Sequence, residues 1–137
     1  MKKNFVFIFA IGLMTLISAC GDTQAPSEDT TGSVIPSGYV GKTNSLASSS
    51  DVLTEGKTVY EKTCSACHGL TGLGDGPASI SLIPPPAILA DFHKTADDEL
   101  LFWRISEGKD GTSMVGWKTV LTEDQIWKVI SYVRTFD

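Results

Sequence analysis

At 137 residues the chain is long enough for one domain. Sixteen acidic side chains against eleven Lys and Arg side chains give a formal net charge of −5 at pH 7. This balance argues against nucleic acid as a partner, because binding to phosphates relies on clustered basic side chains.

Residues 1–19 are predicted to be an export signal. Two lysines give a positively charged start, residues 5–17 form a mostly apolar run, and small residues precede Cys20. The apolar run is short for a membrane span. The stretch Ile-Ser-Ala-Cys at 17–20 resembles the lipobox of bacterial lipoproteins, although the usual Leu stands one place early, at Leu16.

Cys20 is therefore predicted to become the first mature residue and to carry a lipid. The alternatives are an ordinary cleaved signal with a stray cysteine, or an uncleaved anchor. We favour the lipoprotein, because an unpaired thiol in an exported chain otherwise needs its own explanation. The expected location is outside the cytoplasm, anchored by lipid to a bacterial membrane on its periplasmic or outer face.

Residues 20–50 are predicted to be the lipid attachment site followed by a flexible tether. This stretch is rich in Ser, Thr, Gly and Pro and holds few large apolar side chains, so it buries too little surface to offset the entropy of ordering. The alternative is that Val34, Ile35 and Tyr39 pack as an N-terminal extension. The folded domain is expected over residues 51–137.

The first helix of that domain is predicted to lead into the most informative motif of the chain. Gly56, Tyr60 and Cys67 lie among residues that recur at helical spacing. Glycine is costly inside a helix, so Gly56 indicates a second helix that crosses closely at this point. The apolar face of the last helix is the candidate for that contact.

Residues 64–68 read Cys-Ser-Ala-Cys-His, the attachment signature of c-type haem. Each thiol can form a thioether to one vinyl group of haem, and His68 then directs a ring nitrogen at the iron. A zinc site would need Cys64, Cys67, His68 and His93, but adjacent Cys and His residues rarely reach one tetrahedral ion together. A thioredoxin-like dithiol should follow a strand, whereas a helical run precedes this motif.

Residues 69–90 are predicted to be irregular, because glycines and the run Pro84–Pro86 exclude a helix interior. In a haem protein, the second ring nitrogen of the ligand histidine needs a hydrogen-bond partner. We expect a carbonyl of the proline run, at Pro85, to lie next to His68 for this purpose.

Two further helices are predicted. The stretch 95–98, Thr-Ala-Asp-Asp, looks like a capped helix start, with Gly108 as its stop. A loop then leads to Met114. In the last helix Thr122 and Gln125 form a capping box, Leu121 can staple to Ile126, and apolar residues follow at helical spacing.

No stretch alternates as a strand, so the predicted fold class is all-α. The helix order and the haem motif resemble the class I cytochrome c family over about residues 53–136. The specific matches are Gly56 and Tyr60 before the haem motif, the loop Gly-Asp-Gly-Pro-Ala at 74–78, and Leu-Thr-Glu at 121–123. The family usually has proline after the ligand methionine, and this chain has Val115 there.

The resemblance implies one covalently attached haem c, with His68 and Met114 as axial ligands. Residue chemistry agrees, since Met114 is the only methionine left after the signal and an imidazole with a thioether fills both open iron positions and raises the reduction potential. Core packing is the ordinary role of a methionine. His93 is the rival ligand, and we expect it instead at the surface or the haem rim.

Other side chains receive weaker assignments. Trp117 is the best candidate for haem contact, while Trp103 and Trp127 are expected in the core or against the haem. Arg104 is either a propionate partner or a solvated helix charge.

Six-coordinate iron leaves no position for a substrate, so the expected role is single-electron transfer and not enzymatic catalysis. The expected partners are redox proteins in or at the membrane, such as a terminal oxidase, a reductase or a quinol-oxidising complex. The alternatives are a haem sensor or small-ligand binder with a labile Met114, and an electron-transfer subunit of a larger complex.

Overall fold

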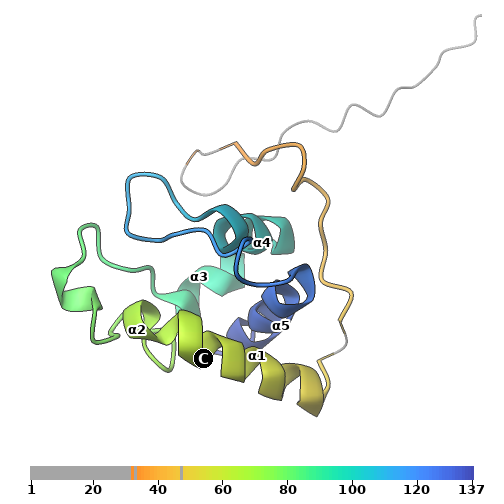
Figure 1. Cartoon of the computed structure of the whole chain (residues 1–137), viewed down its shortest axis with the longest axis horizontal. Coiled ribbons are helices and arrows are strands. Elements are labelled where there is room, and N and C mark those ends of the chain that lie inside the picture. The colour runs from red at the N-terminus through yellow and green to blue at the C-terminus, as the bar shows by residue number, and fades with distance from the viewer. Residues whose placement is uncertain (1–31, 33, 47) are drawn as a thin grey trace, which may run out of the picture.

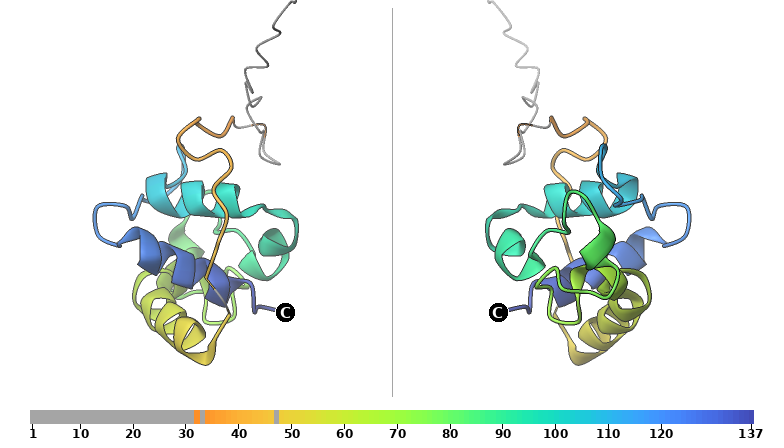
Figure 2. Two further views of the ribbon diagram at one scale, coloured as in Figure 1. Left: turned by 90° about the vertical axis from the view of Figure 1, so that its right-hand side faces the viewer. Right: turned by 90° about the vertical axis from the view of Figure 1, so that its left-hand side faces the viewer.

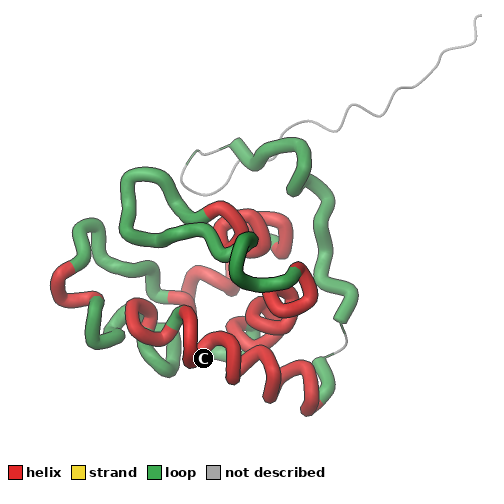
Figure 3. Tube along the Cα trace, viewed as in Figure 1, coloured by secondary structure: helices red, strands yellow, loops and turns green. Residues whose placement is uncertain are grey.

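The computed structural model describes residues 32, 34–46 and 48–137. The predicted signal, Cys20 and the first part of the predicted tether therefore lie outside the described residues. The described elements are α1 (Ser50–Thr63), α2 (Ser65–His68), the 3-10 helix η1 (Ser79–Ser81), α3 (Leu89–Thr95), α4 (Asp98–Glu107) and α5 (Glu123–Val133). No strand occurs in this part of the chain, and the prediction of an all-α fold is confirmed (Figures 1 and 3).

The crossing of α1 and α5 forms the base of the domain (Figure 1). Tyr60 of α1 is fully buried against Val129 and Val133 of α5. A Cβ atom on Gly56 would lie 2.1 Å from the carbonyl oxygen of Lys128. The predicted close crossing at Gly56 is confirmed, because only a residue without a side chain lets the two backbones approach this far.

The last helix begins as its sequence predicts. The Thr122 side chain accepts a hydrogen bond from the backbone N–H of Gln125, and the Gln125 side chain accepts one from the N–H of Thr122. These two bonds satisfy backbone donors that a helix start otherwise leaves without partners. Ile126 and Ile130 then face a second cluster of buried side chains, shared with Leu100, Leu101 and Phe102 of α4.

The region before α4 differs from the prediction. Residues 89–95 form a short helix, α3, within which His93 is only 7% exposed. The Nε2 atom of His93 lies 3.0 Å from the carbonyl oxygen of Phe136, near the C-terminus. The expectation of a surface or haem-rim role for His93 is wrong, because its side chain is buried and lines neither of the two cavities around the proposed haem ligands. Helix α4 starts at Asp98, and its N-cap residue Asp97 makes no side-chain capping bond.

Residues 35–46, which we call the strap, pack on the domain (Figure 2). For residues 35–46 this corrects the prediction of a flexible tether and favours the alternative of a packed extension. Ile35 is 3% exposed and belongs to the cluster of α4 and α5, with Tyr39 packed beside it. Two apolar side chains are too few to form a core of their own, but here they pack on apolar surface that α4 and α5 provide.

Polar contacts hold the far end of the strap. The Asn44 side-chain amide donates to the carbonyl oxygen of Trp127 at 3.2 Å and to Ser131 Oγ at 2.9 Å. The Asn44 backbone N–H donates to Asp98 Oδ2 at 2.9 Å. Lys42 pairs with Glu123 Oε1 at 2.9 Å. The strap therefore ties α4 to α5 from outside.

Among the described residues, no helix combines the length and the apolar character that a bilayer crossing requires.

Candidate haem site

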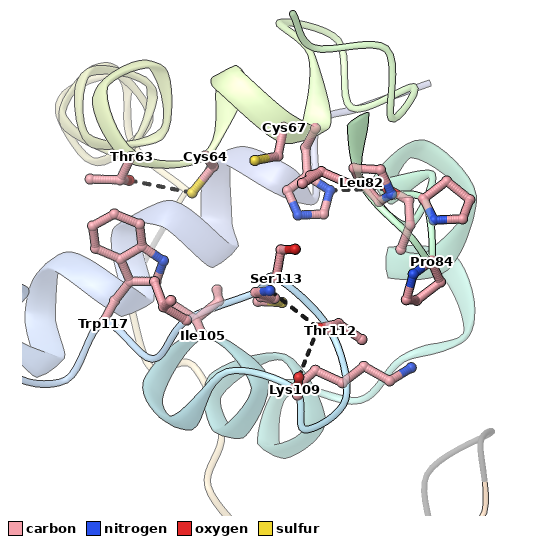
Figure 4. A pocket seen from close by; sticks show the side chains of 16 residues that line it. Thr63, Cys64, Cys67, Leu82, Pro84, Ile105, Lys109, Thr112, Ser113 and Trp117 are labelled. Carbon is pink, nitrogen blue, oxygen red and sulfur yellow. Dashed lines mark hydrogen bonds between the residues drawn. The ribbon is translucent and has the colours of Figure 1, made fainter. Parts of the chain in front are cut away.

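A cavity of about 300 Å³ lies between the α1–α2 corner and the loop that follows α4 (Figure 4). A smaller cavity of about 110 Å³ lies next to it and shares the residues Cys64, His68 and Met114. The larger cavity brings together six residues that the sequence singled out: Cys64, Cys67, His68, Pro85, Met114 and Trp117. Six residues up to 53 positions apart in the sequence thus line one cavity.

The two thiols stand at the break between α1 and α2. Helix α1 ends with Cys64 as its C-cap, and the backbone N–H of His68 donates to the Cys64 carbonyl at 2.9 Å. This turn places both sulfur atoms on the cavity side, and each is a free thiol (Figure 4). Burial raises the pKa of the Cys64 thiol, so this side chain is neutral at physiological pH.

His68 is oriented by a single hydrogen bond. Its Nδ1 atom lies 3.0 Å from the carbonyl oxygen of Ala87. When Nδ1–H donates to that oxygen, the lone pair resides on Nε2, which is the form of imidazole that binds metals. Burial lowers the pKa of His68, which keeps the ring neutral and available as a ligand.

The residue that orients His68 is not the predicted one. We expected the carbonyl of Pro85, whereas the chain passes the histidine two residues later, at Ala87, and Pro85 lines the cavity wall. A proline run fixes the local direction of the chain. Its distance from His68 depends on how the whole loop 69–90 closes, which the sequence pattern does not specify.

Backbone contacts close that loop onto α2. The Ala78 N–H donates to the Ala66 carbonyl at 2.8 Å, and a Cβ on Gly76 would lie 2.4 Å from the same oxygen. The fully buried Tyr60 hydroxyl donates to the Gly69 carbonyl at 2.7 Å. The wall next to His68 is thus anchored to the helix crossing.

Met114 lies in the loop of residues 108–117, which we call the Met loop. Its two ends meet in an antiparallel bridge between Gly108 and Val115, and the Lys109 N–H donates to the Met114 carbonyl at 3.0 Å. The Thr112 hydroxyl accepts from the Met114 N–H at 3.1 Å. Both Met114 and His68 line the two cavities.

Of the tryptophan and arginine side chains assigned from the sequence, some line the cavities and others pack in the core. Trp117 lines the cavity as expected (Figure 4), whereas Trp127 packs with its ring 4.3 Å from that of Phe102 in the core. Arg104 is 9% exposed, lines the smaller cavity and stacks at 4.1 Å over the ring of Trp103. A solvated helix charge is therefore the wrong interpretation of Arg104. A propionate contact of Arg104 stays a prediction.

Several wall residues were not singled out from the sequence, among them Ala87 and Ile105. Ile105 lies in α4 and lines both cavities. The apolar periodicity of a helix is the same whether its face packs against the core or against a cofactor. Only the requirement for a carbonyl after the proline run pointed toward Ala87.

The donors around the cavity fit haem. A neutral imidazole and a thioether lie on its lining together with two thiols and mostly apolar side chains, as haem c requires. The zinc alternative fails, because among the described residues no three His, Cys, Asp or Glu side chains group as metal ligands. When bound, haem supplies a one-electron couple, and the chain would hold it through Cys64, Cys67, His68 and Met114.

An all-α fold with a Cys-x-x-Cys-His corner facing a methionine loop defines a c-type cytochrome. Residues 51–133 match the family described as cytochrome C oxidase, cbb3-type, subunit III, and the chain belongs to this family. The cofactor of this family is haem c, bound covalently.

Two similar proteins carry the name of the same type of oxidase as the matched family. The chain is 31% identical over 97 residues to the cbb3-type cytochrome c oxidase subunit CcoP of Azospirillum sp. (strain B510) and 27% identical over 96 residues to that of Azospirillum brasilense. Each match covers 70% of this chain and 32% of the relative. The chain thus spans about a third of the length of these curated relatives.

One solved structure extends the comparison to the fold. A chain of the reducing HAO-like protein complex from Kuenenia stuttgartiensis aligns with a TM-score of 0.56 and 28% sequence identity. The alignment covers 64% of this chain and 44% of that one. The likeness therefore extends over most of the described helical domain.

Proposed function

We propose that this chain is a membrane-anchored monohaem cytochrome that passes single electrons between exported redox partners, with His68 and Met114 as axial ligands. The observation that carries the proposal is that imidazole and thioether line the same cavity as both thiols. A neutral sulfur favours ferrous iron and raises the reduction potential. With both axial positions filled, the chain would bind no substrate at the iron.

The proposed anchor is a lipid on Cys20. Fourteen residues separate Cys20 from Ile35, the first buried residue of the strap. Whatever its conformation, a segment of this length can span at most about 50 Å, so the domain would stay close to the membrane surface. Mass spectrometry of the mature N-terminus tests this anchor. A Cys20→Ser variant should leave the membrane fraction, and retention of that variant on membranes would contradict the lipid anchor.

A membrane-bound oxidase is the proposed class of partner, because two relatives carry the name of a cbb3-type oxidase subunit. Permanent subunit and mobile carrier differ only in how long the partner stays bound. Copurification from solubilised membranes distinguishes the two. A stable complex at native concentration favours the subunit.

The ligand assignment is tested by absorption spectroscopy of the holoprotein. A pyridine haemochrome spectrum should show thioether-bound haem, and the oxidised protein should show the weak far-red band of sulfur bound to ferric iron. Met114→Ala should abolish this band, while Ser113→Ala, its neighbour in the same loop, should retain it. Absence of the band from the wild type would exclude Met114 as a ligand.

A haem-based binder of small ligands is the second candidate. It is favoured by Val115, which stands where the family usually has proline and is 62% exposed, so this side chain adds little packing to the Met loop. Such a function requires Met114 to leave the iron. Rapid binding of carbon monoxide by the reduced wild type at neutral pH would support it.

A further inference from the structure

The Met loop is held mainly at its neck. Backbone hydrogen bonds join its two ends: Lys109 N–H donates to Met114 O at 3.0 Å, and Trp117 N–H donates to Ile105 O at 2.9 Å. Beyond the neck, the hydrogen bonds of the loop run between its own residues Lys109, Thr112 and Met114, and a Cβ on Gly111 would meet no heavy atom within 4 Å. We therefore expect the contacts at the neck to control opening of this loop.

An ion pair joins the same two ends from outside. Lys118, just after the loop, lies 2.7 Å from the carboxylate of Glu107, just before it. The Glu107 carboxylate also accepts a hydrogen bond from the hydroxyl of Tyr39. Three side chains from different segments thus converge on one point at the base of the Met loop.

Tyr39 reaches this point because the strap is fixed on either side of it. Before it, Ile35 is buried in the core cluster. After it, the Asn44 side-chain amide binds Trp127 O and Ser131 Oγ on α5. The position of the Tyr39 hydroxyl is therefore set by α4 and α5 and not by the Met loop itself.

We propose that Tyr39, Glu107 and Lys118 form a latch by which the strap holds the neck of the Met loop closed and so keeps Met114 at the iron. The three are positioning residues, since none of them lines either cavity. The inference rests on the proposed role of Met114 as the sixth ligand. It assigns a function to an N-terminal segment that precedes the matched residues 51–133.

Displacement of Met114 by added imidazole tests the latch in the ferric holoprotein. Breakage of one exposed hydrogen bond or ion pair should accelerate imidazole binding about 2-fold in Tyr39→Phe and in Lys118→Gln. The double variant should show less than the product of the two effects, because both act through Glu107. Lys94→Gln removes an exposed pair with Asp91 elsewhere and should leave the rate unchanged.

Hydrogen exchange provides a readout that does not depend on the iron ligand. The amides of Lys109 and Trp117, which close the neck, should exchange faster in Tyr39→Phe and Lys118→Gln but not in Lys94→Gln. Unchanged imidazole rates and unchanged exchange in both variants would overturn the latch, even with the far-red band intact. A wild type without that band would overturn the role of the latch at the iron, whatever the exchange shows.

Discussion

The two walls of the cavity are held in different ways. The wall that carries Cys64 and His68 rests on the crossing of α1 and α5, where Tyr60 is fully buried. The wall that carries Met114 is an exposed loop with contacts concentrated at its neck. Elements anchored in the core open only with global unfolding, whereas surface loops open locally at lower cost. The thioether side is thus the side where the site can be adjusted without unfolding of the domain.

The largest expected effect is at the helix crossing. Gly56→Ala places a Cβ against the carbonyl of Lys128, where only backbone can yield, so we expect a loss of about 3 kcal/mol in the free energy of unfolding of the holoprotein. Denaturant titration measures it. Gly38→Ala, at a strap position where a Cβ meets nothing within 4 Å, is the control. Equal losses in both variants would contradict the close crossing at Gly56.

The same chemical change in both regions gives a sharper comparison. Tyr60→Phe removes a buried bond and leaves the Gly69 carbonyl without its donor, at a cost of about 1–2 kcal/mol in unfolding free energy. Tyr39→Phe removes an exposed bond and should cost about 0.5 kcal/mol or less. The order should reverse for imidazole binding, where only Tyr39→Phe accelerates. Equal stability losses would show that the latch belongs to the core.

The titration of Tyr39 gives a further test of the latch. Burial, followed by the hydrogen bond to Glu107, raises the pKa of Tyr39 from 10.0 to about 12. Since the folded pKa lies above the unfolded one, the contribution to stability is complete below pH 10 and is lost as pH rises toward 12. An ultraviolet difference titration of wild type against Tyr39→Phe measures this pKa. A tyrosinate that forms near pH 10 would contradict the Tyr39–Glu107 bond.

At low pH the latch is limited by Glu107, whose pKa is shifted in the direction opposite to that of Tyr39. Hydrogen bonds from Lys118 and then from Tyr39 lower the pKa of Glu107. Its contribution is therefore present above the ordinary carboxyl pKa and is lost as pH falls through the lowered value. The latch is thus complete throughout the neutral range.

Predictions were correct where the local sequence marks the interaction. The capping box of Thr122 and Gln125 lies within four residues. The crossing at Gly56 is a long-range contact with Lys128, but a glycine within a helical pattern marks it. Predictions failed where the partner lies far along the chain and no such residue marks the contact. His93 is bound by Phe136, and Ile35 is buried by helices that begin more than sixty residues later.

By itself, the sequence determined the haem motif, the helical fold class and the candidate ligands, because these follow from residue chemistry and from spacing within one or two turns. The tertiary structure decided which carbonyl faces His68, where Arg104 is buried and how the strap reaches the Met loop. These features depend on how loops close over long separations. No periodicity within the strap marks Tyr39 as a partner of Glu107, since their contact exists only after α4 and α5 have packed.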